Sequence, residues 1–205
     1  LHKRPERPLA QRGTDPRHAR LTDAVRSNRS GRVFGNRSVL GARPGTHVRL
    51  LIRADGNRTI GGGHVMRSLA LARHLVAGGG AATLLSVDLD PALEARATRV
   101  GVAVVRAALD PAAGGATAIA SEADRHWVSD SLRSGEYDWL MLDGYHFKDD
   151  FIRPLADGPA HVLLADDDGQ CDEYRVHVVL NQNPSANEAL YPRRSAHTEL
   201  LLGQD

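Results

Sequence analysis

Short apolar stretches alternate with amphipathic stretches from residue 48 onward, and this alternation limits the possible folds more than any other feature. The apolar stretches predict strands at 48–54, 82–87, 102–105, 137–143, 161–165, 176–180 and 200–202. The helical patterns between them cover 64–76, 91–100, about 117–132 and 149–155. Nearly continuous apolar strands that alternate with helices are typical of a parallel sheet covered on both faces. We therefore expect an α/β, Rossmann-like fold.

The charge distribution divides the chain into two parts. Residues 1–47 hold 11 of the 26 basic residues and 3 of the 25 acidic residues, so this part carries +8 and the remainder −7. Few large apolar side chains occur in 1–47, and such a composition favours disorder. Its basic residues form no helical stripe and have no interleaved aromatic residues. We therefore prefer a disordered extension, or sequence translated from a misplaced start, over an arm for nucleic acid or anionic lipid. Residues 48–205 are the expected folded domain.

The remaining global features favour a soluble, cytoplasmic protein. Cys171 is the single cysteine, which excludes an intramolecular disulfide. No apolar run reaches the length of about 20 residues that spans a bilayer, and no signal peptide is recognisable at the start. The chain begins with Leu1 and stops at Asp205 directly after an apolar run, so we expect it to be a fragment.

A glycine-rich turn joins the first predicted strand to the first predicted helix. Gly61, Gly62 and Gly63 allow a ligand to approach the backbone closely. The amide groups at a helix start lack partners within the helix and favour anions, so a diphosphate would suit this position. The spacing does not match the dinucleotide-binding pattern, because His64 follows the third glycine directly.

His64 is a candidate general base, because the helix dipole at this position disfavours the imidazolium form. The alternative is a histidine that only caps the helix or bonds a neighbouring carbonyl. Asp143 and Tyr145 follow the fourth predicted strand at the same sheet edge and could bind sugar hydroxyls, although Asp143 could equally cap a turn.

Two groups of polar residues are interpreted as incidental. Consecutive carboxylates cannot all face one ion, so Asp166, Asp167 and Asp168 are expected to form a solvated turn rather than a magnesium site. Four histidines have no ligand spacing with one another and are expected to have no joint role: His126, His161, His177 and His197.

The glycine-rich stretch and several later motifs resemble one known family. The stretch Arg53-Ala-Asp-Gly-Asn-x-x-Ile-Gly-x-Gly-His64-x-Met-Arg67 is similar to the opening of the UDP-2,4-diacetamido-2,4,6-trideoxy-β-L-altropyranose hydrolases of pseudaminic acid biosynthesis. These hydrolases are relatives of spore-coat polysaccharide proteins and of MurG-like GT-B glycosyltransferases. Further matches lie, in the family's order, at Asp143-x-Tyr145, Asp166-Asp167, Cys171-Asp172, 179–186, Tyr191 and 200–203. The resemblance covers residues 48–205.

The resemblance implies a two-domain enzyme that cleaves the anomeric carbon–oxygen bond of a UDP-sugar with inversion and without a metal or cofactor. His64 would activate the attacking water, and the backbone of 61–63 would help to hold the substrate. Arg53, Asp143 and Tyr145 would complete the substrate contacts. The family's C-terminal domain supplies most uridine and diphosphate contacts and has no counterpart here. We therefore expect this chain alone to hydrolyse the UDP-sugar slowly or not at all.

Two other functions remain open from the sequence. A GT-B glycosyltransferase of the MurG type shares a glycine-rich first loop followed by a histidine. It would need an acceptor or membrane surface, and residues 48–205 show no amphipathic basic patch of that kind. A non-catalytic domain that binds a nucleotide sugar or a partner protein is the third possibility. The oligomeric state cannot be derived from the sequence.

Overall fold

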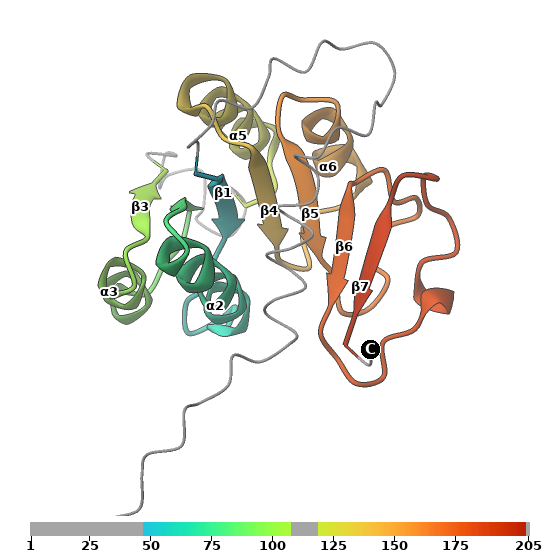
Figure 1. The fold of residues 1–205 in the computed structure, drawn as a ribbon, viewed down its shortest axis with the longest axis horizontal. Helices are drawn as coiled ribbons and strands as arrows, with labels where there is room; N and C mark the ends of the chain where they lie inside the picture. The colour runs from blue at the N-terminus through green and yellow to red at the C-terminus, as the bar shows by residue number, and fades with distance from the viewer. Residues whose placement is uncertain (1–46, 108–118, 204–205) are drawn as a thin grey trace, which may run out of the picture.

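The domain is built on one seven-stranded parallel sheet. The computed structural model describes residues 47–107 and 119–203, so the predicted extension lies almost entirely outside the described residues. The sheet has the order β3-β2-β1-β4-β5-β6-β7, and all neighbouring strands are parallel (Figure 1). The strands are β1 Arg49–Ala54, β2 Ala81–Ser86, β3 Ala103–Arg106, β4 Trp139–Asp143, β5 His161–Ala165, β6 Val178–Asn181 and β7 Glu199–Leu202. The α/β, Rossmann-like prediction is confirmed.

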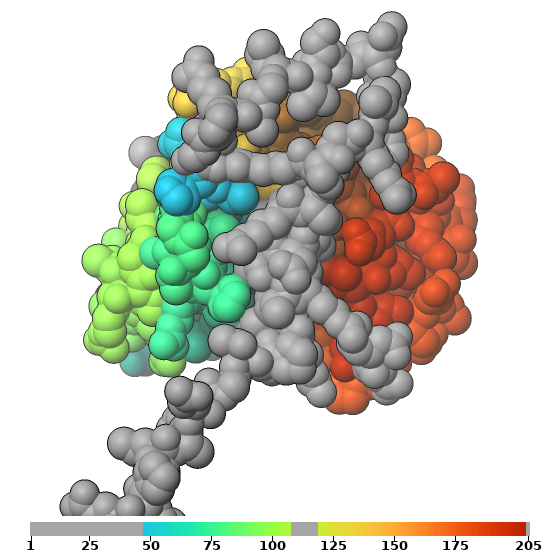
Figure 2. Space-filling model, in the orientation of Figure 1, coloured from blue at the N-terminus to red at the C-terminus, as the bar shows by residue number. Residues whose placement is uncertain are grey.

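Helices cover both faces of this sheet. They are α2 Gly63–Ala77, α3 Pro91–Arg99, α5 Glu122–Gly135 and α6 Asp149–Ala156, with a 3-10 turn η2 Glu188–Leu190. Alternate residues of each strand enter two separate cores. Ile52 packs with α2 and α3 residues on one face, and Leu51 packs with α5 and α6 residues on the other. In Figure 2 the early segments and the late segments lie on opposite sides of the molecule, as the strand order requires.

The strand order reverses between β1 and β4, and this reversal fixes where a ligand can bind. From β1 the chain proceeds outward to β2 and β3, and then returns to place β4 on the other side of β1. The loops that leave β1 and β4 therefore diverge to opposite faces and open a crevice at the carboxyl ends of the strands. Ala54 pairs with Asp143 at these ends, so the glycine-rich turn and the Asp143 loop border the same crevice.

Most predicted element boundaries agree with the structure to within two residues, but the start of α5 differs. The helix predicted from about residue 117 begins at Glu122 after the cap residue Ser121, whose side chain accepts a hydrogen bond from the Asp124 amide. Residues 117 and 118 lie outside the described part of the chain. Ala120 has a φ of 57°, a left-handed conformation that a continuous helix cannot contain. Within the described residues, no helix is long and apolar enough to cross a membrane.

Three histidines gather at the amino-terminal edge of the sheet, a proximity that their spacing in the sequence does not indicate. The ring centroids of His161 and His177 are 4.4 Å apart, and those of His177 and His197 are 5.6 Å apart. Trp139 packs beside them, 5.1 Å from His161. Each of these residues opens a strand or shortly precedes one, so parallel pairing brings them together although their spacing in the sequence is irregular.

This histidine cluster predicts a loss of stability in acid. Burial, together with the charges of His161 and His197, lowers the pKa of His177 to about 4. Burial also lowers the pKa of His161, against the opposing charge of Asp138. An unfolded histidine titrates near 6.5, so the unfolded chain binds more protons between about pH 4 and 6.5. Above this window the histidines are neutral in both states and the free energy of unfolding is at its full value. As the pH falls through the window, the free energy of unfolding decreases by about 2 kcal/mol.

The measurement is urea unfolding at several pH values between 4 and 7. In His177→Asn the amide oxygen can replace Nδ1 as the acceptor for the Val162 amide, a bond of 3.1 Å. We expect this variant to show a flatter pH dependence than the wild type. His126→Asn, at an exposed position of α5, serves as the control and should leave the slope unchanged. Equal slopes for His177→Asn and the wild type would contradict the prediction.

Candidate functional site

The glycine-rich turn between β1 and α2 is held by its own polar groups. The side-chain oxygen of Asn57 accepts hydrogen bonds from the amides of Thr59 at 2.7 Å and Ile60 at 2.6 Å. The Gly61 amide donates to the Asn57 carbonyl at 2.8 Å. Gly61 has a φ of 85°, so only this position among the three glycines requires the left-handed conformation. The turn is therefore a fixed scaffold that leads directly into α2.

The first turn of α2 offers unpaired amide groups at the crevice. Gly62 is the cap residue and Gly63 the first helical residue. The first backbone hydrogen bond from the helix to its cap runs from the Met66 amide to the Gly62 carbonyl, so the amides of Gly63 and His64 precede it. A β-carbon added at Gly63 would meet no atom within 4 Å, which leaves its backbone open to a ligand.

His64 lies beside this open backbone and under the ring of Tyr145. The histidine is only 7% exposed, and its buried Nδ1 atom has no hydrogen-bond partner among the described residues. The two rings make an edge contact with their centroids 4.8 Å apart. Tyr145 is 49% exposed and borders solvent. The structure thus places His64 next to four other residues that are predicted to act on substrate. These are Gly61–Gly63, which precede it in the chain, and Tyr145, which contacts its ring.

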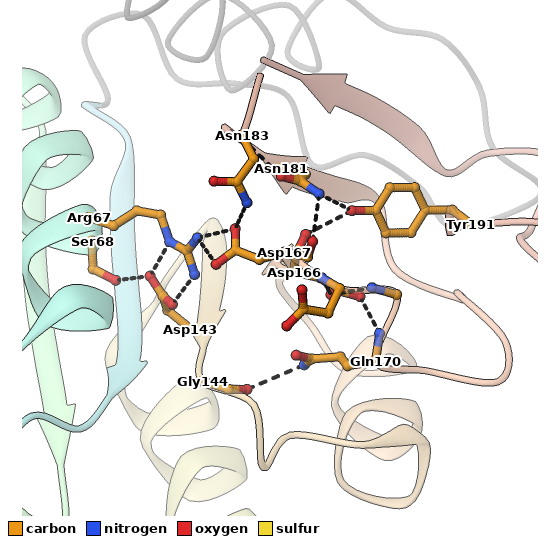
Figure 3. A network of polar contacts seen from close by, with 12 residues as sticks. Arg67, Ser68, Asp143, Gly144, Asp166, Asp167, Gln170, Asn181, Asn183 and Tyr191 are labelled. Carbon is orange, nitrogen blue, oxygen red and sulfur yellow. Dashed lines mark hydrogen bonds and ion pairs between the residues drawn. The ribbon is translucent and has the colours of Figure 1, made fainter. Parts of the chain in front are cut away.

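Asp143 is placed differently from the prediction, because its carboxylate cannot reach a ligand in this conformation. The residue is fully buried at the end of β4. Its two oxygens accept hydrogen bonds from Arg67 Nη2 at 2.6 Å and Nε at 3.0 Å, and Ser68 adds a third at 3.1 Å. Figure 3 shows this pair between α2 and the loop after β4. Asp143 therefore supports the site from below instead of lining it.

Arg53 is likewise predicted to bind substrate, and its guanidinium is fully buried. Its Nε and Nη2 atoms bond to Asp124 of α5 at 2.9 and 2.8 Å, and its Nη1 atom bonds to Asp55 at 2.6 Å. Asp55 also accepts from the amides of Val87 and Asp88. Because its donors all face protein acceptors, Arg53 ties β1 to α5 and to the loop after β2.

The acidic run after β5 is an ordered part of the site instead of a solvated turn. Asp166 is fully buried and accepts from the amides of three residues that follow it and from the Tyr174 hydroxyl. Asp167 binds Arg67 Nη1 through both oxygens, at 2.6 and 2.8 Å. Asn183 donates to Asp167 at 3.1 Å, which links the loop after β6 to the same network. The prediction of a solvated turn is wrong for Asp166 and Asp167, whose carboxylates bind nearby donors, whereas Asp168 is exposed.

The charges of the crevice are unequal between its two sides. On the β4–β5 side a single guanidinium, Arg67, faces the carboxylates of Asp143 and Asp167. Burial raises the pKa of the Tyr145 hydroxyl, and the negative charges of Asp167 and Asp168 raise it further. The α2 side presents helix-start amides instead. An anionic group of a ligand is therefore favoured above the glycines, and an uncharged polar group above Tyr145.

Sequence reasoning missed Arg67, Ser68 and Asn183. Arg67 was part of the quoted motif without a role, although its position one turn after His64 places both on related faces of α2. The link to Asp167, 100 residues later, left no local signal. In the described ranges, no group of three or more His, Cys, Asp or Glu residues is arranged to hold a metal ion.

The comparisons with known proteins add no family. The chain matches none of the protein-family profiles and none of the curated proteins with which it was compared.

Proposed function

We propose that this domain acts on a UDP-linked sugar, with hydrolysis of a UDP-2,4-diacetamido-2,4,6-trideoxy-sugar as the reaction that the motif resemblance favours. His64 would activate the attacking water, the backbone of Gly61–Gly63 would help to hold the anionic group, and Tyr145 would contact the sugar. The observation that carries the proposal is the position of His64, in the first turn of α2 directly after three glycines and against an exposed tyrosine.

The distribution of charge supports a ligand with one anionic and one neutral part. A diphosphate above the amides of Gly63 and His64 would gain from the helix dipole. A second anion above Tyr145 would meet the excess negative charge of Asp143 and Asp167. A sugar that carries hydroxyl and acetamido groups has no such charge and can hydrogen-bond there. UDP is also a good leaving group, so a base with correct positioning can suffice without an acid.

Gly63→Ala tests whether a ligand approaches the turn. The added methyl group meets no protein atom within 4 Å, and alanine favours the helix, so the stability should stay equal or rise by up to about 1 kcal/mol. The affinity for the UDP-sugar should fall by about tenfold, because the methyl group occupies the space next to the amides. The measurement is titration of the 15N-labelled chain followed by NMR, with shifts expected at 61–65 and Tyr145.

Ala77→Gly, at the exposed last residue of α2, is the matched control, because it also exchanges glycine and alanine on this helix but lies far from the glycine-rich turn. It should lower stability modestly and leave the affinity unchanged. An unchanged affinity in Gly63→Ala would remove the glycine-rich turn from the binding site.

A non-catalytic domain that binds the same ligand is the second candidate, and one observation favours it. A histidine base needs an acceptor for its second ring nitrogen, which fixes the tautomer. Within the described part of the chain, Nδ1 of His64 has no hydrogen-bond partner, and both oxygens of Asp143 already accept from Arg67 or Ser68. In a binding domain His64 would contribute hydrogen bonding only. Binding of the UDP-sugar without turnover, in every form of the protein that includes this domain, would favour this candidate.

A further inference from the structure

Arg67 lies at the centre of the polar network under the candidate site. Its guanidinium binds Asp143 through two nitrogens and Asp167 through the third, with all distances between 2.6 and 3.0 Å. The arginine side chain is 8% exposed, and the two acid side chains are 0% and 16% exposed. Figure 3 shows the guanidinium between the two carboxylates. All three nitrogens therefore face protein acceptors, and none is directed to a ligand phosphate.

The two ends of the Arg67–Asp143 pair coincide with the two sides of the candidate site. Arg67 lies three residues after His64 on α2, one helical turn away. Asp143 lies two residues before Tyr145, at the start of the loop that leaves β4. The ion pair therefore joins the helix that carries the histidine to the loop that carries the tyrosine, the same two segments that the contact between their rings joins.

The second arm of Arg67 fixes the neighbouring loops. Asp167 also accepts from the side chain of Asn183, and its backbone carbonyl accepts from Asn181 at 3.1 Å. Asn181 donates in addition to the Tyr191 hydroxyl at 2.7 Å. Through Asp167 the arginine thus holds the loops that follow β5 and β6.

We propose that Arg67 is a positioning residue of the site, which holds Tyr145 against His64 through its bidentate pair with Asp143. A lysine cannot replace it, because one ammonium group lacks the planar fork that spans two carboxylates. The inference rests on the proposed function for the roles of His64 and Tyr145. It adds that the distance between these two rings depends on a residue that contacts no ligand.

The test is a ligand-free NMR measurement of the contact between the two rings. The wild type should give cross-peaks between the ring protons of His64 and Tyr145, whose centroids are 4.8 Å apart. Arg67→Lys and Asp143→Asn should both lose these cross-peaks while the signals of the two cores stay dispersed. Asp167→Asn breaks only the second arm and should retain them. Arg73→Lys, at an exposed position of the same helix, is the matched control.

Persistence of the cross-peaks in both Arg67→Lys and Asp143→Asn would overturn the proposal. Loss of the whole fold in both variants would overturn it as well, because Arg67 would then stabilise the domain in general. If only Arg67→Lys fails to fold, the cross-peaks in Asp143→Asn decide: their loss supports the proposal and their persistence overturns it. Where the protein turns over the UDP-sugar, Arg67→Lys should lower kcat about tenfold or more with a smaller change in KM. If no UDP-sugar is bound at all, the proposed function fails while the ring contact can still be scored.

Discussion

Replacement of Asp124 by alanine is expected to lower the free energy of unfolding by about 3–5 kcal/mol, the largest effect of any single change considered for this protein. Asp124 accepts both hydrogen bonds of the Arg53 fork, and both side chains are fully buried. Without it the guanidinium keeps only Asp55 as a partner, so part of a buried positive charge becomes uncompensated. The Ala120 amide, which donates to Asp124 at 2.9 Å, also loses its acceptor.

Urea unfolding at neutral pH measures this loss, and Asp130→Ala is the matched control. Asp130 belongs to the same helix, and its exposed ion pair with Arg133 is formed at 2.8 Å. Exposed pairs of this kind contribute little, so the control should change stability by less than about 0.5 kcal/mol. A similar small effect of Asp124→Ala would show that water or another group replaces the carboxylate.

Replacement of His64 is expected to have the largest effect on activity. If His64 is the general base, both His64→Ala and His64→Asn should lower kcat for the UDP-sugar by about 10²- to 10⁴-fold. Binding should change much less, because the backbone of Gly61–Gly63 and the ring of Tyr145 remain. The measurement is UDP release in a form of the protein that turns over the substrate, with affinity determined separately.

His126→Asn is the control for this experiment, since His126 lies on the exposed face of α5 and contacts Glu122. Its turnover should equal that of the wild type. Near-normal activity in both His64 variants would remove His64 from the base role. That result would favour the non-catalytic binding domain, with which the lack of a hydrogen-bond partner for Nδ1 among the described residues agrees.

The fold could be predicted from the sequence because its signals are local. The strand runs and helical patterns each lie within a few residues, and the cap residues Asp90 and Ser121 mark two helix starts. The boundary error at α5 arose because helical periodicity continued upstream of Ser121, where the left-handed Ala120 ends it. Several strand boundaries differ by one or two residues, since a strand begins where its neighbour offers a partner.

The candidate site was predictable only in part. The glycine-rich turn and His64 are adjacent in the sequence, so their joint position at a helix start could be derived. Asp143 was recognised as a polar group at a strand end and Arg53 through the resemblance, but the burial of both depends on partners in other elements. Asp124 lies 71 residues from Arg53, and Arg67 lies 76 residues from Asp143. No local pattern states whether such a charge faces solvent or another charge.

The alternation of strands and helices, with His64 after three glycines, was determined by the sequence itself, because backbone propensity and periodicity act over short distances. Only the tertiary structure decided which polar residues can meet a ligand. Parallel pairing of β4 with β1 and with β5 collects the acids at one edge, and Arg67 then forms ion pairs with Asp143 and Asp167 there. The same pairing collects His161, His177 and His197 at the opposite edge. The burial and pairing of a charge depend on residues that are far from it in the sequence, and these residues come into contact only in the folded chain.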